Sequence, residues 1–474
     1  MTWARGIAYI DSAMRTPLRR PLLALLSLGL ALPALAQDAH YWTNQYGTRA
    51  TLLGGAVIGS VLDLSGTYYN PGGMSLVEKP QTLMAANIIQ YPHLSLVGSR
   101  AEAVPLNAHN PSPAPTLVAG TFRVRGLGPR HWFGYSYLAR QAVKLGASVS
   151  GTGVWDIIPG AFGPEDFATQ FRLDEKLAEN WLGLTWSYRL AKPLGFGVSQ
   201  YLAVRSHWTQ VQERVEVLTG AGGTAAALGA RQYRYSHFRL LWKVGLALDL
   251  KEVTLGLTVT TPSVAISGRG MTGVDTSVVG LDVDGDGTAD NDLAANYQDR
   301  LPAVYRSPFS LAMGVTFKIQ KVRIYASGEW FERVRPYTVV DAEEFAAQSS
   351  GEMLSTDLTQ ELEAVLNTGF GLEWFYSSRF KGYASFSTDY SAKRPGTATN
   401  ISVTDWDNYH FMTGAEFFVK RTALTVGLGY SFGSRRVGNR PTVLEHGGVL
   451  GAWDPFEDLK FRFATYKLIL GIAI

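Results

Sequence analysis

The chain has 474 residues, and its 43 Lys and Arg nearly balance its 40 Asp and Glu. Charged residues make up 18% of the chain, below the roughly 25% of ordinary soluble domains, while Gly reaches 50 residues and Cys is 0. The near-neutral balance gives no indication of nucleic-acid binding, and the lack of cysteine excludes disulfides, thiolate catalysis and zinc–thiolate sites.

The N-terminus has the pattern of a secretory signal peptide. Arg15, Arg19 and Arg20 form a positive region, residues 21–33 are apolar, and 34–36 read Ala-Leu-Ala, a small-x-small cleavage site. We therefore expect cleavage after Ala36, so that residues 1–36 are an N-terminal extension and signal peptide. Met14 directly precedes this pattern, and we expect it, rather than Met1, to be the true start.

Segment 46–74 is small, apolar and rich in glycine, and Arg49 and Asp63 are its only charged residues. It ends in Tyr69-Asn70-Pro71-Gly72, which is turn chemistry because proline fixes φ and glycine tolerates positive φ. We interpret residues 37–80 as a plug that folds inside a barrel, anchored by Tyr69, Asn70, Pro71 and Gly72. The alternative is a surface loop that precedes the first strand of any β protein.

From about residue 81 to the end, the chain is a succession of segments with alternating polarity. In 309–319, Phe, Leu, Met, Val, Phe and Ile alternate with Ser, Ala, Gly, Thr and Lys, and 422–432 and 238–250 behave in the same way. This period of two places alternate side chains on opposite faces of a strand. Outside the N-terminus, no apolar run reaches the ~18 residues of a membrane helix.

The connections alternate between short and long. Residues 251–252, 320–321 and 420–421 make short turns, whereas 218–232, 271–296 and 341–361 are expected to be long loops. Tight turns on one side and long loops on the other are typical of an outer-membrane barrel. The expected fold is an all-β membrane protein, with residues 81–474 forming an antiparallel barrel of about 14 strands around the N-terminal plug. Several strands exceed the ~9–11 residues needed to cross the bilayer, so the wall should extend above it.

Together these features resemble the FadL/TodX family of outer-membrane transporters for long-chain fatty acids and aromatic hydrocarbons. The resemblance covers the mature chain and rests on the signal peptide, the small-residue segment, Tyr69-Asn70-Pro71 and the strand count. Family members have Asn-Pro-Ala where this chain has Asn70-Pro71-Gly72. The resemblance implies that 46–74 is a hatch, and that the protein passively transports hydrophobic compounds across a bacterial outer membrane. It also implies sideways release through a break in the wall, for which Gly134 and Gly146 are candidates.

Two groups of residues are candidates for binding sites. Asp282, Asp284, Asp286, Thr288 and Asp290 match positions 1, 3, 5, 7 and 9 of a calcium loop, although Leu293 replaces the glutamate of position 12. They predict a structural Ca²⁺ in loop 271–296; the alternative is a solvated acidic loop. Basic residues on inward faces could hold a fatty carboxylate by charge-assisted hydrogen bonds, or could simply pair with lumen acids: Arg205, Arg239, Lys243 and Arg323.

Three other functions are alternatives to transport. A diffusion porin would lack an apolar plug, an outer-membrane enzyme would need a catalytic constellation, and an adhesin would use the loops. The chain has no Gly-x-Ser-x-Gly elbow and its histidines are scattered, so we expect no enzymatic activity and no required cofactor. Expected partners are outer-membrane lipids, a hydrophobic small molecule and the barrel-assembly machinery, and the protein is expected to be a monomer. Residues from about Leu358 are predicted to form an amphipathic helix, as a landing site or a lid.

Overall fold

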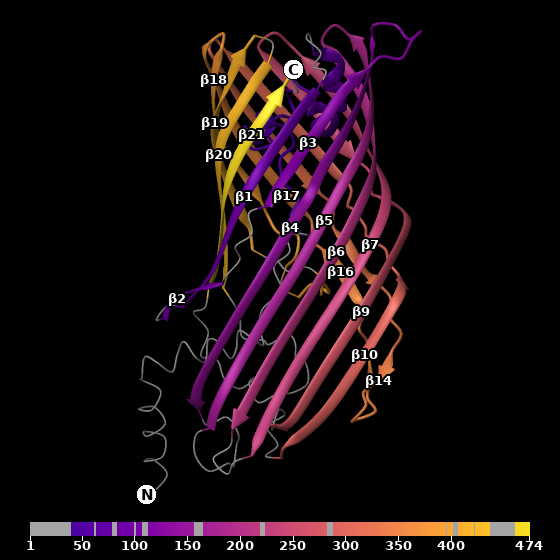
Figure 1. Ribbon diagram of the computed structural model, residues 1–474. Helices are drawn as coiled ribbons and strands as arrows, with labels where there is room; N and C mark the ends of the chain where they lie inside the picture. The colour runs from indigo at the N-terminus through magenta and orange to yellow at the C-terminus, as the bar shows by residue number, and fades with distance from the viewer. Residues whose placement is uncertain are drawn as a thin grey trace, which may run out of the picture.

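The computed structural model describes residues 39–60, 63–77, 83–98, 101–106, 112–155, 165–218, 223–281, 288–394, 396–401, 406–420, 422–436 and 460–474. The predicted signal peptide, its cleavage site and the choice between Met1 and Met14 lie outside the described residues. Figure 1 shows a tall barrel in which strands on one side extend much further than those on the other.

One sheet of 17 strands forms the wall. They are β1 (Leu83–Gly98), β2 (Ala101–Leu106), β3 (Ser112–Phe122), β4 (His131–Trp155), β5 (Glu165–Ala191), β6 (Leu194–Leu218), β7 (Thr224–Asp249), β8 (Val253–Thr260), β9 (Val264–Leu281), β10 (Asp290–Pro302), β11 (Ser310–Ile319), β12 (Val322–Phe331), β17 (Val365–Ser377), β18 (Phe380–Asp389), β19 (Asn408–Val419), β20 (Thr422–Arg436) and β21 (Lys460–Ala473).

The strands close into a barrel of fourteen positions. β8 and β9 both pair with β7, one after the other along its length, and therefore share one position. In the same way, β11 pairs with β8 and β10 pairs with β9, so β10 and β11 share the next position. β2 is a short strand that pairs with the end of β1 and adds no position. The last strand, β21, pairs with β1 from Met84↔Ala473 to Val97↔Lys460, and every pairing in the wall is antiparallel. The predicted fold class is therefore confirmed.

The two faces of each strand differ as the alternation predicts. On β11, Met313 is 61% exposed on the outer face, whereas Ala312 and Thr316 are buried on the lumen face. Leu428 on β20 and Leu184 on β5 are likewise exposed. A belt of outward apolar side chains suits contact with lipid. Among the described helices, none has the length and apolar character to cross a membrane.

The strands β4 to β7 are much longer than a bilayer requires. They have 25 to 27 residues each, whereas β11, β12 and β18 have 10. The predicted extension of the wall is confirmed, and β4 to β7, β9 and β10 form the tall side in Figure 1. Two predicted loops are correspondingly wrong in extent: residues of 218–232 and 271–296 mostly continue β7, β9 and β10. Each strand continues because its neighbour offers a partner over the same length.

Two segments fill the lumen from opposite ends. The plug, residues 39–77, contains the short helices α3 (Thr48–Leu52), α4 (Gly66–Tyr69) and η2 (Pro71–Leu76) and lies near the end with the short turns (Figure 1). The lid, which we define as residues 332–364 with 390–401, contains β13 (Val334–Val340), β14 (Phe345–Ala346), β15 (Met353–Leu354) and β16 (Leu358–Leu362).

The lid folds inward rather than projecting outward. It packs on Tyr233 and Tyr235, which lie on the lumen face of β7, and buries Val340 and Leu358 against them. β13 pairs with β16, so the helix predicted from Leu358 is wrong. A neighbouring strand with free backbone groups outweighs the helical spacing of leucines in this segment.

Candidate functional site

The plug contacts the wall at positions where the wall has no side chains. Eleven of the described wall glycines, which we call the glycine belt, face it: Gly134, Gly195, Gly197, Gly245, Gly256, Gly314, Gly369, Gly371, Gly414, Gly427 and Gly471. A Cβ at Gly256 would lie 1.9 Å from the carbonyl oxygen of Ile58, and one at Gly471 would lie 1.6 Å from Thr48. Such distances are impossible for real atoms, so the belt is what lets the plug backbone touch the wall.

The predicted anchor lies on this belt and is fully buried. The side chain of Asn70 donates from Nδ2 to the carbonyl oxygens of Leu246 (2.9 Å) and Ile58 (3.1 Å), and its Oδ1 accepts from the Gly72 N–H (3.1 Å). Pro71 and Gly72 pass over Gly195, Gly197 and Gly245 of β6 and β7. One asparagine thus ties the end of the plug to itself and to the wall.

The first residues of the plug, 39–45, form a strap held by a different set of contacts. Asp389, at the end of β18, accepts from the backbone N–H groups of Tyr41 and Trp42 and from the Thr43 hydroxyl. Lys467 donates to the Thr43 carbonyl oxygen at 2.9 Å. The role of Asp389 is not predictable from the sequence, because a single acid on a lumen face looks like any other polar lumen residue.

Helix α3 is held by a second buried acid that sequence analysis also missed as an anchor. Glu373 on β17 makes a salt bridge of 2.8 Å with Arg49 and accepts a hydrogen bond from Tyr325. Arg323, one of the predicted ligand cations, lies 3.6 Å from the same carboxylate. Arg323 is therefore placed beside the plug anchor.

The strap also joins the plug to the lid. The N–H of Ala392 donates to the carbonyl oxygen of Ala39 (2.9 Å), and the N–H of Glu363 donates to that of Ala392 (2.7 Å). Tyr41 stacks on Phe331 with ring centroids 4.1 Å apart, at the point where β12 leads into the lid. The inner and outer closures of the lumen are thus in direct contact.

A central cavity of about 50 Å³ lies between the plug and the lid. Its apolar lining comes from the strap, α4, β5, β12 and β16 and from the segment between β10 and β11: Tyr41, Tyr68, Trp181, Tyr305, Phe331 and Leu362. One water needs roughly 10–15 Å³ by this measure, so the cavity has room for a few waters only. The structure therefore represents a closed state.

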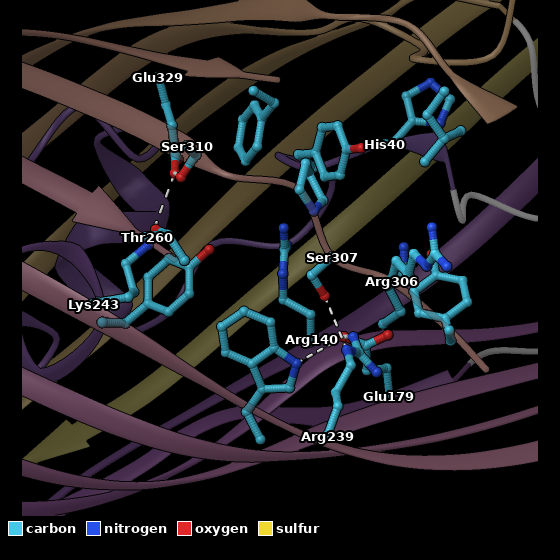
Figure 2. Close-up of a pocket in the computed structure, with 18 residues that line it drawn as sticks. His40, Arg140, Glu179, Arg239, Lys243, Thr260, Arg306, Ser307, Ser310 and Glu329 are labelled. Atoms are coloured by element: carbon cyan, nitrogen blue, oxygen red, sulfur yellow. Dashed lines mark hydrogen bonds and ion pairs between the residues drawn. The ribbon is translucent and has the colours of Figure 1, made fainter. Parts of the chain in front are cut away.

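Charged residues line the same cavity, as Figure 2 shows. Arg239 and Arg205 both form ion pairs with Glu179, and Lys243 lies 3.8 Å from Glu329 and 4.2 Å from the ring centre of Tyr68. Three of the four predicted ligand cations therefore come together around the cavity. Arg239 keeps one buried nitrogen, Nη1, without a hydrogen-bond partner among the described residues.

Among the described residues, the pairing between β3 and β4 ends beside this cavity. β3 pairs with β4 only from Phe122↔Phe133 to Leu117↔Leu138, and among the described strands none pairs with that edge of β4 further on. Arg140, which lines the cavity, lies in a β-bulge between Ala139 and Gln141, just past the point where this pairing ends. The predicted candidates for a break lie elsewhere: a Cβ on Gly134 would meet Met74 of the plug, and Gly146 lies further along β4.

The predicted calcium residues lie mostly outside the described part of the chain. Asp282, Asp284 and Asp286 are not described, Asp290 begins β10 with its side chain undescribed, and Thr288 is exposed. Among the described residues, no group of three or more His, Asp or Glu side chains is placed to hold a metal ion. The calcium site stays a prediction.

No protein-family model matches the chain, and no curated protein matches its sequence. Solved structures do match. The toluene transporter TodX of Pseudomonas putida is 12% identical with a TM-score of 0.56, covering 90% of this chain and 98% of its own. The chain has the FadL-type fold. A Pseudomonas aeruginosa FadL homologue is 13% identical with a TM-score of 0.52, covering 92% of this chain and 98% of its own. The Ralstonia pickettii toluene transporter TbuX is 12% identical with a TM-score of 0.52, covering 90% and 98%.

At this level of identity the likeness concerns the FadL-type fold alone. It agrees with the geometry found here, a fourteen-stranded barrel with an N-terminal segment in the lumen. The arrangement of plug, cavity, lid and open strand edge is what a function has to explain.

Proposed function

We propose that this protein is a passive channel for hydrophobic compounds in a bacterial outer membrane. One observation carries the proposal: a cavity lined by aromatic side chains lies between two closures and next to an edge of β4 that pairs with no described strand. A hydrophobic solute entering from outside would pass the lid, bind in the cavity and leave sideways between β3 and β4. The solved structures that share the fold, which carry the names of toluene transporters and a FadL homologue, support this choice.

Transport requires the cavity to enlarge, because its present volume is far below that of a fatty acid or an aromatic hydrocarbon. A ligand that binds the enlarged state more tightly than the closed state would shift the population toward it. We propose that the plug, anchored at Tyr69, Asn70, Pro71 and Gly72, is the gate. The protein then acts without catalysis, as a monomer inserted by the barrel-assembly machinery after cleavage behind Ala36.

Two measurements test the channel together. Cells producing the protein should take up long-chain fatty acid or toluene faster than cells without it, while the purified protein should stay closed to ions in planar bilayers. A variant lacking 46–74 should conduct ions. Free conductance by the intact protein would contradict the proposal and favour a porin for polar solutes.

We further propose that a carboxylate is bound at the cavity by Arg239 and Lys243, with Arg205 behind them. Among the described residues, Arg140, Arg239, Lys243 and Arg306 line the cavity and Arg205 lies behind them, whereas the carboxylates that line it are those of Glu179 and Glu329. The unpartnered Nη1 of Arg239 supports an acceptor from outside the chain. Buried donors left unpaired cost about 1–3 kcal/mol, so a ligand that pairs them gains affinity.

Uptake of two substrates separates this carboxylate site from the channel itself. Lys243→Gln should raise the KM for a fatty acid by on the order of tenfold and leave toluene uptake unchanged, because hydrogen bonds to charged groups contribute roughly 1.5–3 kcal/mol. Arg323→Gln, whose charge lies beside Glu373 instead, is the matched control. Equal losses for both substrates, or no loss in either, would contradict the carboxylate site and leave the channel proposal standing.

A further inference from the structure

A row of basic residues crosses the outer surface of the tall side of the barrel. We call it the basic row: Lys144 on β4, Lys176 on β5, Arg234 on β7 and Arg269 on β9. All four side chains are exposed, and they share the outer face with the apolar residues of the same strands. Trp208 of β6 stands in the row between Lys176 and Arg234, with the Lys176 nitrogen 5.1 Å from its ring centre.

The register brings these cations close to one another. Lys144 is directly opposite Lys176, Lys176 is opposite Trp208, and Trp208 is opposite Arg234. On β9, Arg269 lies opposite Ser236, two residues along the same face from Arg234. Like charges directly opposite each other on adjacent strands destabilise a sheet. The folded protein thus keeps a repulsive arrangement on this surface.

Two outward cations close to the row are neutralised within their own strand. Arg172 forms a salt bridge with Asp174 on β5, and Arg214 forms one with Glu216 on β6. None of the four residues of the basic row makes an ion pair with any described residue. Both of these ion pairs lie further from the short turns than the row, so the chain places local acids beside the cations above the row and leaves the row itself uncompensated.

The height of the row on the barrel indicates what faces it. Lys144 lies 13 residues along β4 from His131, and Arg234 lies 15 residues before the end of β7 at Asp249. With a rise of about 3.3 Å per residue and a strand tilt of roughly 40°, both lie roughly 30–40 Å from the short turns. The apolar band of such barrels is only about 25 Å tall, so the row stands just beyond it.

The outer surface becomes apolar below the row, four to eight residues along the strands toward the short turns. Leu182 and Leu184 on β5 and Phe238 on β7 are all exposed there. A molecule that fits both zones carries negative groups at the level of the row and acyl chains below. A free phosphate would match the cations but leave the apolar zone unused.

We propose that the basic row binds the phosphates of a glycolipid in the outer leaflet of the membrane. The phosphates bind between the cations and offset the repulsion among them. Trp208 supplies a flat surface for the sugar, and the acyl chains lie on the apolar zone. The proposal needs the protein to reside in an outer membrane, but it does not depend on transport.

The test compares lipid binding by purified full-length protein in nanodiscs. A phosphorylated diglucosamine lipid and its enzymatically dephosphorylated form are titrated, and bound lipid is counted by native mass spectrometry. The triple variant Lys144→Gln, Lys176→Gln and Arg234→Gln should bind the phosphorylated lipid on the order of 100-fold more weakly, since each cation near an anionic lipid surface contributes roughly fivefold. The double variant Arg172→Gln and Arg214→Gln, which removes outward cations that are already paired, should bind like the wild type.

Three outcomes would overturn the proposal. The triple variant could bind the phosphorylated lipid as tightly as the wild type, the dephosphorylated lipid could bind equally well, or the control variant could lose as much affinity. If inorganic phosphate displaced the lipid at an equal concentration, the ligand of the basic row would be a soluble anion, and the glycolipid proposal would be wrong. Heat-dependent gel migration checks that each variant is a folded barrel, and unchanged fatty-acid uptake separates this result from the fate of the channel proposal.

Discussion

The plug and the lid close the same lumen through different kinds of contact. The plug packs closely against the glycine belt, in large part through backbone atoms, and Asn70 is one of its buried polar ties to the wall. The lid touches the wall mainly through large side chains, such as Tyr235 and Val340, and through hydrogen bonds that stay partly exposed, such as Gln348 with Ala295. Segments with fewer buried contacts open at lower free energy, so the lid should open more readily than the plug.

This difference suggests a division of labour along the path. A closure that fits by backbone has one position, because nothing at the contact can rotate out of the way. A closure that fits by side chains has many rotamers available. The strap, residues 39–45, lies between the two and bonds to both, so movement of the lid has a direct route to the plug.

The largest effect is expected from a side chain placed in the glycine belt. Gly245→Val would put a Cβ 2.4 Å from Asn70 Oδ1 and 2.8 Å from Pro71, so the plug has to leave its position. We expect large ion conductance in planar bilayers from a barrel that still resists heat. Gly229→Val on the same strand, where a Cβ would meet nothing within 4 Å, is the control and should stay closed. A closed Gly245→Val barrel would mean that the belt does not position the plug.

A smaller destabilisation of the plug is expected when the hydrogen bonds of Asn70 are removed without adding a larger side chain. Asn70→Ala deletes both bonds from Nδ2 and the one to Oδ1 and should destabilise the plug by about 2–3 kcal/mol. Brief channel openings and impaired uptake should follow. Asn70→Asp keeps the acceptor for Gly72 but loses the donors, so it should resemble Asn70→Ala if the bond to Leu246 matters most. Pro71→Ala should have a smaller effect than Asn70→Ala, since it removes no hydrogen bond and changes chain entropy and the packing of one ring on Gly245.

A substitution in the lid tests whether the lid opens without the plug. The Tyr337 hydroxyl donates to Gln360 and accepts from the Arg306 N–H, joining β13, β16 and the wall segment after β10. Tyr337→Phe should weaken the lid by about 1 kcal/mol and raise amide hydrogen exchange in 334–362, with no change in 48–76. Faster exchange in the plug as well would show that the two closures open as one unit.

The smallest effect concerns the outer edge of the lid. Ser349, in the turn between β14 and β15, bonds to the Leu293 N–H and to Asp292, close to the predicted calcium residues. Calcium at Asp282, Asp284 and Asp286 would steady this end of β10 against the lid. Calcium should slow protease cleavage in 282–289 severalfold in the wild type but not in the variant Asp284→Ala with Asp286→Ala. Equal cleavage with and without calcium would contradict the site.

The barrel and the plug are predictable from the sequence because both depend on local residue patterns. Lipid on one face forces strict alternation, as in 309–319, and turn chemistry marks Asn70-Pro71. Above the membrane that constraint disappears, so the small residues Ala225 to Ala227 give no alternation and their pattern predicts a loop. The spacing of leucines in the lid predicts a helix, because the strand that pairs with this segment, β13, is brought beside it only by the tertiary fold. Asp389 and Glu373 were missed as anchors because only the fold reveals which lumen acids meet the plug.

Gly471 has a consequence for how the molecule is made. It lies on β21, opposite Ala86 of β1, where the last strand to be synthesised meets the first, and Thr48 of the plug occupies the space a side chain would take. The seam of the barrel therefore closes around a residue from the very beginning of the folded chain. The finished barrel therefore brings three distant parts of the polypeptide together at one point, and strands β1 and β21 paired without the plug would leave the space beside Gly471 unfilled.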